Sequence, residues 1–431
     1  MISANRPLND ESMGSWLALA KPVGPITSNQ PALSMPFQRW FKFKEAFAPS
    51  FVAKILRRLP IQPRNCLDPF GGSGTTALVC QFLGIESTTI EVNPLVADVA
   101  QAKLTHYDND ELCNSMQAVL RAARNWSKAD FEKGFVGAPK TFVEPGEEGR
   151  WIFNRDVAKV ILTLRSAIES LKRRDHSRFF RVMLASRLVE VSNILVNGKG
   201  RRYRRNWRNR DVTPEDLLAA FEKSCSAAMD DIKMFGSRPR SKFTVLRGDA
   251  RKHTAKYPKV DFILTSPPYP NSFDYTDIYN VELWALGYLK SGEDNRILRK
   301  ETLRSHVQIK HPEEPADLLS PTLTETYRRL AGRRKNLWNR NIPEMVCHYF
   351  EDMHDVLAGC KAVLKKDGHA VLAVGDSRYD GVVIDVPKIL SEIAAQVGFK
   401  IVRTEAVRTM RASAQQGGRY VLKESLVWLN L

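Results

Sequence analysis

The chain has 431 residues, of which 43% are hydrophobic and 26% are charged. This length and composition exclude wholesale disorder and are typical of a globular protein with a large core, built as one elaborated domain or as a domain with an insertion. The 65 Lys and Arg residues outnumber the 48 Asp and Glu residues, and the resulting net charge of +17 favours a polyanionic partner such as nucleic acid, with solubility or membrane attraction as alternative uses of the charge.

The sequence contains no signal for a membrane, a disulfide framework or a metal. No window approaches the roughly 18 uninterrupted apolar residues that a membrane span needs, and residues 1–36 lack the basic and apolar regions of a signal peptide. The six cysteines have neither C-x-x-C spacing nor nearby His pairs. We therefore expect a soluble protein of the cytoplasm, associated with the nucleoid, with reduced thiols and without a metal site or a membrane partner.

The first part of the chain predicts an open α/β sheet. Residues 1–36 are rich in Pro, Ser and Asn and predict an N-terminal arm or irregular cap. In residues 37–105, a short helix beginning near Pro49 precedes two strand–helix units. The second strand ends at Glu91 and is followed by a helix with Asn93 as its N-cap. Two such units in succession predict the α/β class, with a doubly wound, mostly parallel sheet.

The pattern then breaks and resumes. Residues 106–240 are predicted to be mostly helical, and strands return in residues 241–431 with FTVLRGDA and VDFILTSPPY. This last part contains a basic, weakly patterned insert at about 290–340, then an amphipathic helix, a strand, a helix ending at Gly398 and two closing strands. We therefore expect a core in two parts with a large helical insertion between them.

The first motif is DPFGGSGTT, which runs from Asp68 to Thr76 between a predicted strand and a predicted helix. Its glycines allow a tight turn and a close approach to a ligand, beside the free N–H groups of a helix N-terminus. It lacks the Gly-Lys-Ser/Thr ending of a P-loop, which disfavours hydrolysis of a nucleoside triphosphate. Glu91, about 20 residues on, is placed to hydrogen bond the ribose of a nucleoside-containing cofactor. The alternative is a structural turn with an exposed Glu.

The second motif is SPPY, from Ser266 to Tyr269, which follows an apolar strand at the edge where α/β sheets place their sites. The two prolines fix the backbone and remove donors, so that carbonyl oxygens point into a cleft. A carbonyl and a side-chain oxygen together accept both hydrogens of an exocyclic amino group, and Tyr269 offers a flat face to a base. In isolation this turn is equally a plain loop, but its pairing with the Gly-rich turn favours a catalytic role.

The two motifs together resemble those of the S-adenosylmethionine-dependent amino-methyltransferases that act on DNA bases. Members of that family have a D-P-F-x-G-x-G-T-T cofactor loop and a (D/N/S)-P-P-Y catalytic loop. The resemblance covers residues 37–105 and 241–431 and includes FKFKEAFAPSFVAKIL and GDAR, residues 248–251. It implies a Rossmann-like class I methyltransferase fold, with S-adenosyl-L-methionine as the cofactor and double-stranded DNA with a flipped base as the substrate.

The resemblance also assigns site residues. The cofactor-binding residues would be Asp68, Phe70, Gly71, Gly72, Ser73, Gly74, Thr75, Glu91 and Asp249. Of these, Asp68 and the glycine turn would hold the methionine end, Glu91 the ribose and Asp249 the adenine. The catalytic residues would be Ser266, Pro267, Pro268 and Tyr269. Asp274, shortly after the tetrad, is a candidate proton acceptor, although a loop or helix-capping role is favoured.

The first residue of the tetrad bears on the base that is methylated. In the family, Ser at this position goes mostly with N4 of cytosine, and Asp or Asn mostly with N6 of adenine. N4 of cytosine is therefore favoured here, with adenine N6 in DNA and amino groups of structured RNA as alternatives. The chain has no Pro-Cys dipeptide, which disfavours covalent catalysis at carbon 5 of cytosine.

The most basic run in the chain lies inside the insertion. GKGRRYRRNWRNR, residues 198–210, interleaves arginines for phosphates or guanine edges with aromatic rings for stacking. The DNA-binding candidates are Arg201, Arg202, Tyr203, Arg204, Arg205, Trp207 and Arg208. The alternative is a solvated charged face, which is disfavoured here because almost no acidic residues neutralise the run. For the second basic cluster, at 333–335, DNA contact and a solvated face are equally favoured. SAQQGGRY, residues 413–420, is predicted to be a Gly-rich loop that lines the cleft or forms a plain turn.

The resemblance places target recognition between the two motifs, within residues 106–240. We therefore expect a site-specific DNA methyltransferase acting on N4 of a flipped-out cytosine. Restriction–modification or phage defence is the expected setting, with a cognate restriction endonuclease or defence-system subunits as partners. The alternative from another class is an inactive DNA-binding subunit, against which the intact motifs argue.

Overall fold

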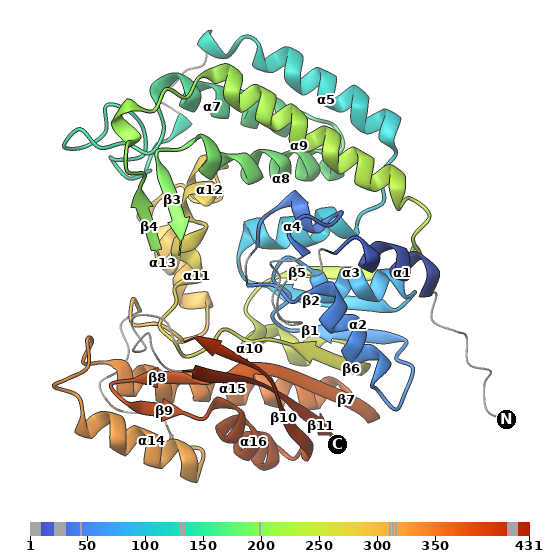
Figure 1. Ribbon diagram of the computed structural model, residues 1–431, viewed down its shortest axis with the longest axis vertical. Helices are drawn as coiled ribbons and strands as arrows, with labels where there is room; N and C mark the ends of the chain where they lie inside the picture. The colour runs from blue at the N-terminus through green and yellow to red at the C-terminus, as the bar shows by residue number, and fades with distance from the viewer. Residues whose placement is uncertain are drawn as a thin grey trace.

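The computed structural model describes residues 10–20, 32–43, 45–128, 134–197, 200–309, 312, 314, 317–411 and 421–431. Its centre is a seven-stranded sheet with the order β10-β11-β7-β6-β1-β2-β5 (Figure 1). The strands are β1 (Asn65–Asp68), β2 (Glu86–Glu91), β5 (Phe243–Arg247), β6 (Val260–Thr265), β7 (Leu364–Gly375), β10 (Lys400–Arg411) and β11 (Val421–Asn430).

Five neighbouring strands, from β5 to β7, are parallel, and β11, which lies between β7 and the edge strand β10, runs antiparallel to both of these neighbours. This arrangement confirms the predicted α/β class with a mostly parallel, doubly wound sheet, as expected of a Rossmann-like class I methyltransferase. Because side chains alternate along each strand, the sheet has an apolar core on each face. Cys66 and Phe262 belong to one core, and their neighbours Leu67 and Ile263 to the other.

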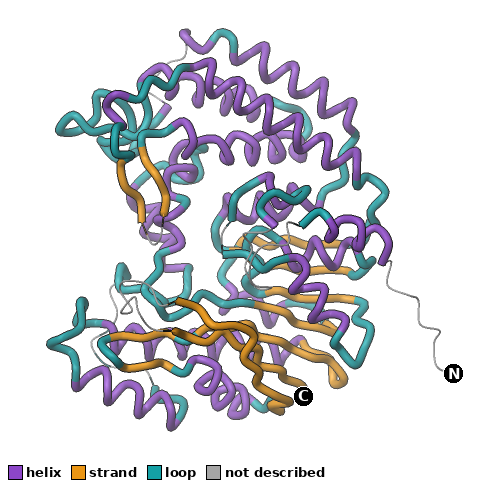
Figure 2. Tube along the Cα trace, viewed as in Figure 1, coloured by secondary structure: helices purple, strands orange, loops and turns teal. Residues whose placement is uncertain are grey.

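Helices cover both faces (Figures 1 and 2). One core includes residues of α2 (Pro49–Arg57), α3 (Thr75–Phe82) and α4 (Pro94–Leu104). The other includes residues of α10 (Ala250–His253), α15 (Ile342–Val363) and α16 (Val386–Val397). Asn93 caps α4 and Gly398 ends α16 in the left-handed region, as predicted.

The insertion is largely a group of packed helices above the sheet in Figure 1. These are α5 (Asn109–Ala123), α7 (Arg155–Glu169), α8 (Arg174–Val191) and α9 (Pro214–Met234). The sequence predicted residues 106–240, which include VSNILV at 191–196, to be mostly helical, and for the end of VSNILV this is wrong. Ile194–Asn197 instead forms strand β3, which pairs with β4 (Gly200–Tyr203) in an antiparallel hairpin. The β-branched residues Ile194 and Val196 occur in helices as well as in strands. Pairing with the arginine-rich strand β4 makes this segment a strand.

Two buried charged residues of the insertion attach it to the core. Asp231 on α9 accepts hydrogen bonds from the backbone nitrogen of Phe37 and from Nε1 of Trp40, both at 2.9 Å. The guanidinium of Arg238 donates to Oε1 of Gln81 and to the carbonyl oxygen of Thr105, both at 2.8 Å. Because a buried charge is costly without partners, Asp231 holds the end of α9 against residues 37–40, and Arg238 holds the segment after α9 against α3 and the end of α4.

Smaller elements complete the structure. The segment predicted as an N-terminal arm contains helix α1 (Asp10–Ala18), whose Trp16 stacks on Phe82 with ring centroids 4.5 Å apart. The weakly patterned basic insert includes the helices α13 (Gly292–Glu301) and α14 (Pro321–Gly332). The remaining elements are α11 (Tyr275–Ile278), α12 (Asn280–Ala285), α13 (Gly292–Glu301), α14 (Pro321–Gly332), β8 (Ser377–Tyr379), β9 (Val382–Ile384), η2 (Gln38–Trp40), η3 (Trp126–Lys128), η4 (Trp207–Asn209) and η5 (Thr254–Lys256). None of the helices in the described ranges has both the length and the apolar composition needed to cross a bilayer.

Candidate active site

Loops that follow four parallel strands meet around one cavity of about 450 Å³. The loop after β1 contributes Phe70 and Gly72, the end of β2 contributes Glu91, and the loop after β5 contributes Asp249. The loop after β6 contributes the whole tetrad, Ser266, Pro267, Pro268 and Tyr269. Two sequence motifs almost 200 residues apart thus line a single site, at the sheet edge where α/β proteins bind ligands.

The Gly-rich turn lies against an aromatic side chain. Gly72 has a φ of +50°, and a Cβ at this position would stand 2.9 Å from Cε1 of Phe43. The amide of Gly71 donates a 3.0 Å hydrogen bond to the carbonyl oxygen of Ile90, which ties the turn to β2. Any side chain at position 72 would therefore strain the backbone and collide with the Phe43 ring, which packs against the turn.

The predicted cofactor-loop residues divide into two groups. Phe70 and Gly72 line the cavity, whereas the lining residues in the described part of the chain do not include Asp68, Gly71, Ser73, Gly74 or Thr75. Asp68 accepts from Oγ1 of Thr265 at 2.8 Å and from the amide of Phe70 at 3.1 Å. Burial raises the pKa of Asp68 to about 6. In this structure, Asp68 links β1 to β6 through Thr265 and holds the backbone of the Gly-rich turn through the amide of Phe70.

A buried lysine supports the same turn. Lys103 on α4 has no exposed surface, and its Nζ donates to the carbonyl oxygen of Ser73 at 3.1 Å and to Oε1 of Gln38 at 3.4 Å. Burial lowers the pKa of Lys103 to about 7. The sequence analysis missed this residue, and the only signal for it is a lysine between the apolar residues Ala102 and Leu104 of its helix.

Glu91 occupies the position predicted for a ribose contact. Its Oε1 accepts a 2.8 Å hydrogen bond from the amide of Asn93, and it lines the cavity. Burial raises the pKa of Glu91 to about 7, although hydrogen bonds from the amides of Asn93 and Gly72 favour the ionised form. Glu91 therefore changes its charge near neutral pH and has carboxyl oxygens at the cavity wall.

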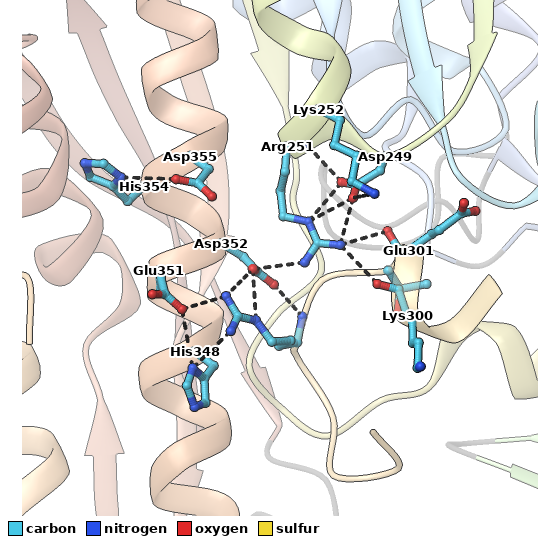
Figure 3. A network of polar contacts seen from close by, with 12 residues as sticks. Asp249, Arg251, Lys252, Lys300, Glu301, His348, Glu351, Asp352, His354 and Asp355 are labelled. Carbon is cyan, nitrogen blue, oxygen red and sulfur yellow. Dashed lines mark hydrogen bonds and ion pairs between the residues drawn. The ribbon is translucent and has the colours of Figure 1, made fainter. Parts of the chain in front are cut away.

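Asp249 lies in the cavity wall within a charged network (Figure 3). Its carboxylate accepts from the backbone nitrogen of Arg251 at 2.9 Å and from the guanidinium of the same residue at 2.8 Å. Arg251 also contacts Asp352 on α15 at 2.9 Å, and it donates to the carbonyl oxygens of Lys300 and Glu301. Arg251 thus fixes Asp249 and the end of α13, and it occupies part of the acceptor capacity that a bound adenine would use.

The Ser266–Tyr269 tetrad is held by the antiparallel edge of the sheet. The Tyr269 hydroxyl donates to Oε1 of Glu424 on β11 at 2.8 Å, and Glu424 in turn pairs with Arg408 on β10. Burial and the carboxylate of Glu424 raise the pKa of Tyr269, while a hydrogen bond from Ser266 lowers it. The single proton of the Tyr269 hydroxyl is therefore directed to Glu424, and Ser266 lines the cavity beside Tyr269.

Aromatic side chains form the wall opposite the tetrad. Phe43 and Tyr279 stack with ring centroids 5.5 Å apart and an interplanar angle of 15°. The Tyr279 hydroxyl donates to Oε2 of Glu45 at 2.8 Å. Both rings line the cavity together with Phe273 and Tyr275. Of these residues, only Phe43 and Glu45 belong to a segment that the sequence analysis singled out, and it assigned no role to them.

Asp274 caps a helix. Its Oδ1 accepts from the amide of Thr276 at 2.9 Å, and its Oδ2 accepts from Nε of Arg299 at 2.8 Å. Burial alone would raise the pKa of Asp274, but His306, Thr276 and Arg299 together lower it. The lining residues in the described ranges do not include Asp274, which agrees with the capping role favoured from the sequence.

The basic run forms strand β4 and the turn after it, beside the elements that follow the tetrad. Arg201 pairs with Asp277 on α11 at 2.8 Å, and Arg204 donates to the carbonyl oxygens of Ser192 and Val189 at 3.0 and 2.9 Å. Arg201, Arg202, Arg205 and Arg208 are exposed.

The aromatic residues of the basic run pack within the insertion. Trp207 is buried, and its ring lies 4.9 Å from the ring of Trp151 and 4.9 Å from that of Tyr203. The guanidinium carbon of Arg208 lies over the Trp207 ring, 4.5 Å from the ring centroid. The run is therefore a structured hairpin with an exposed arginine surface. Of the other two candidate regions, 333–335 includes Arg334, which pairs with Glu344, and SAQQGGRY lies outside the described residues.

Comparisons with known proteins find methyltransferases. No protein-family profile matches the chain. The chain is 26% identical to the type II methyltransferase M.AvaI of Nostoc sp. over 449 aligned positions, which cover 94% of this chain and 88% of the relative. It is 24% identical to the type II methyltransferase M.BsoBI of Geobacillus stearothermophilus, and the alignment covers 94% of this chain and 87% of the relative.

The solved structure of TrmN from Thermus thermophilus aligns at 14% identity with a TM-score of 0.29 and covers 89% of this chain and 48% of that one. This likeness is too slight to bear on function. The chain is thus similar to type II methyltransferases over nearly its whole length.

Proposed function

We propose that this chain is a DNA methyltransferase that uses S-adenosylmethionine to methylate the exocyclic N4 of a flipped-out cytosine. One observation carries the proposal. The glycine turn, the Glu91 carboxyl and the Ser266–Tyr269 tetrad, which lie far apart in the sequence, line the same cavity. The similarity to type II methyltransferases over 94% of the chain supports it independently.

The residues at the Gly-rich end of the cavity fit S-adenosylmethionine. Gly72 lines the cavity at a point where a Cβ would collide with the Phe43 ring, and Glu91 offers a carboxyl acceptor for the two ribose hydroxyls. Phe70 and Asp249 supply an apolar face and a polar edge for the adenine. When it is bound, S-adenosylmethionine supplies an electrophilic methyl group.

The tetrad makes the target nitrogen a better nucleophile. The lone pair of an aromatic amino group is delocalised into the ring. Oγ of Ser266 and the carbonyl oxygen of Pro267 would accept the two amino hydrogens, which favours a tetrahedral nitrogen with its lone pair free. The Ser266 hydroxyl suits this task because it lines the cavity and its oxygen has lone pairs that accept hydrogen bonds. No strong general base is required, since the amino proton becomes acidic as the nitrogen acquires the methyl group.

A base reaches this cavity only when it leaves the duplex, which costs a few kcal/mol. The ring of Tyr269 and the aromatic wall of Phe43, Tyr275 and Tyr279 offset that cost by stacking and by excluding water. The exposed arginines of the β3–β4 hairpin, Arg202, Arg205 and Arg208, would contact the DNA backbone. The other candidates, Arg201, Tyr203, Arg204 and Trp207, would hold the hairpin in shape.

The biological setting would be restriction–modification or phage defence in the cytoplasm, at the nucleoid. Methylation would protect the host sequence from a cognate endonuclease, which is the partner implied by this role. The helical insertion, residues 106–240, would recognise the target sequence.

The deciding experiment incubates the protein with methyl-labelled S-adenosylmethionine and unmethylated duplex DNA, followed by digestion to nucleosides and mass spectrometry. We expect labelled N4-methyldeoxycytidine. Labelled N6-methyldeoxyadenosine would keep the DNA methyltransferase and replace the target base. Label in RNA alone, or no transfer by a protein that binds S-adenosylmethionine, would contradict the proposal. Gly72→Asp is the matched control without a cofactor site.

A further inference from the structure

A second cavity, of about 490 Å³, lies beside the candidate active site. The two cavities share two wall residues, Glu45 and Tyr279. The second cavity lies between the insertion, represented by α8 and β3, and the helices α11 and α12 that follow the catalytic tetrad. Its volume falls within the range of about 300–1,000 Å³ that is typical of small-molecule sites.

The most unusual group in this wall is the carboxyl of Glu282 on α12. The residue is 5% exposed, and its Oε2 has no hydrogen-bond partner among the described residues. Burial raises the pKa of Glu282 to about 7, although a hydrogen bond from its own backbone amide and the charge of Arg201 favour the ionised form. A buried carboxyl oxygen without a partner destabilises a folded protein, because its desolvation cost is not recovered.

Neighbouring polar groups in the same wall have partners within the protein. Glu190 pairs with Arg187 at 3.1 Å, and Arg204 donates to two backbone carbonyls of the insertion. The Tyr279 hydroxyl donates to Glu45. Glu282 therefore differs from these groups in presenting an unused acceptor, and a ligand that donates a hydrogen bond would supply the missing partner.

We propose that the second cavity holds a nucleobase of the DNA substrate other than the methylated one, and that Glu282 recognises it by accepting a hydrogen bond from its exocyclic amino group. This inference rests on the proposed function. A carboxylate is the side chain that accepts from N4 of cytosine in protein–DNA contacts. Phe41 and Tyr279 provide aromatic surface in the same wall, and Lys42 and Arg187 provide positive charge for a neighbouring phosphate.

The position of the cavity suits a specificity site. Glu282 follows Tyr269, the last residue of the tetrad, by only 13 residues. The opposite wall of the cavity belongs to the candidate recognition region. A base held there would lie close to the flipped target. Loss of the correct amino group would leave the carboxyl unpaired again, so that the wrong base is penalised.

The test begins with the sequence that the wild-type protein methylates, mapped by sequencing of treated plasmid DNA. Duplexes with this sequence are then made in which each base other than the target is replaced in turn by an analogue without its amino group: 2-pyrimidinone for cytosine, purine for adenine and inosine for guanine. For wild type, we expect one replacement to weaken binding about tenfold or more. In Glu282→Ala, that same replacement should cause no further loss.

Glu282→Gln separates recognition from folding. We expect its melting temperature and its affinity for S-adenosylmethionine to equal or exceed those of wild type, because it replaces an unpaired carboxyl by a neutral amide. Glu190→Gln is the matched control in the same wall, and it should keep the wild-type base preference. Equal weakening of Glu282→Ala on every duplex, or a clear loss of melting temperature in Glu282→Gln, would overturn the inference. If the wild-type protein transfers no methyl group to DNA, the proposed function fails instead.

Discussion

The hydroxyl of Tyr269 donates a 2.8 Å hydrogen bond to Oε1 of Glu424, although the two residues are 155 positions apart in the sequence. Glu424 is itself paired with Arg408 on the neighbouring strand. The antiparallel edge of the sheet therefore orients Tyr269 and with it the Ser266–Tyr269 loop.

Tyr269→Ala removes both the ring and this hydrogen bond. We expect single-turnover methylation to fall about ten- to a hundredfold or more, because stacking of a base on an aromatic ring contributes roughly 1–3 kcal/mol. Tyr269→Phe keeps the ring, so it should retain much of the activity while losing about 1 kcal/mol of unfolding free energy. If Tyr269→Phe is as inactive as Tyr269→Ala, the hydroxyl and not the ring carries the effect.

Ser266→Ala tests the acceptor role of the hydroxyl. Its contact with the amino group strengthens as the nitrogen becomes tetrahedral, so the substitution should lower the single-turnover rate more than it lowers DNA affinity. The single-turnover rate is measured on a saturating duplex, and DNA affinity is measured by titration in the absence of turnover. A variant that loses affinity but keeps the wild-type rate would show that Ser266 positions the DNA.

Gly72→Ala should strongly weaken binding of S-adenosylmethionine in calorimetry. The new Cβ would stand 2.9 Å from Phe43 in a backbone with a φ of +50°, and it would fill the space in front of the turn. Gly84→Ala is the matched control, because Gly84 has a φ of +74° but no atom within 4 Å of the added Cβ. Equal effects of the two substitutions would mean that backbone strain alone is responsible and that the cofactor site is misplaced.

The affinity for S-adenosylmethionine should depend on pH through Glu91. Burial raises the pKa of Glu91 to about 7, and ribose hydroxyls donate to the ionised form, so binding favours loss of its proton. The affinity should therefore rise as the pH is raised from about 6 to about 8, by up to tenfold per pH unit below the pKa, and level off above it. In Glu91→Gln, affinity should be lower at pH 8 and nearly constant across this range. The same pH dependence in the variant would assign it to another group.

The arginine surface of the hairpin should contribute to DNA affinity in a salt-dependent way. Replacing Arg202, Arg205 and Arg208 with Ala should weaken binding and flatten its salt dependence by about one unit of slope per lost phosphate contact. Affinity for S-adenosylmethionine should stay unchanged. Arg121→Ala with Arg124→Ala, two exposed arginines at the end of α5 in the same insertion, is the control for the change in charge. An unaltered slope in the hairpin variant would make this run an ordinary solvated surface.

Local sequence determined much of the core. Strand–turn–helix patterns around Gly72 and Asn93 depend on contacts within a few residues, so the cofactor turn, the caps and the parallel strands were predictable from the sequence alone. The SPPY turn after β6 was equally visible, because two prolines and a preceding apolar strand define its conformation locally. These features place both motifs at the carboxyl edge of the sheet.

Only the tertiary structure decided which distant groups meet. The strand in VSNILV exists because it pairs with the arginine-rich strand, and Lys103, Glu282 and Glu424 gain their roles from burial beside residues far away in sequence. A lysine or glutamate in a helix or strand looks the same in sequence whether it faces water or a cavity wall. Its pKa and its hydrogen-bond partners depend on the burial that packing imposes, and packing is a property of the whole fold.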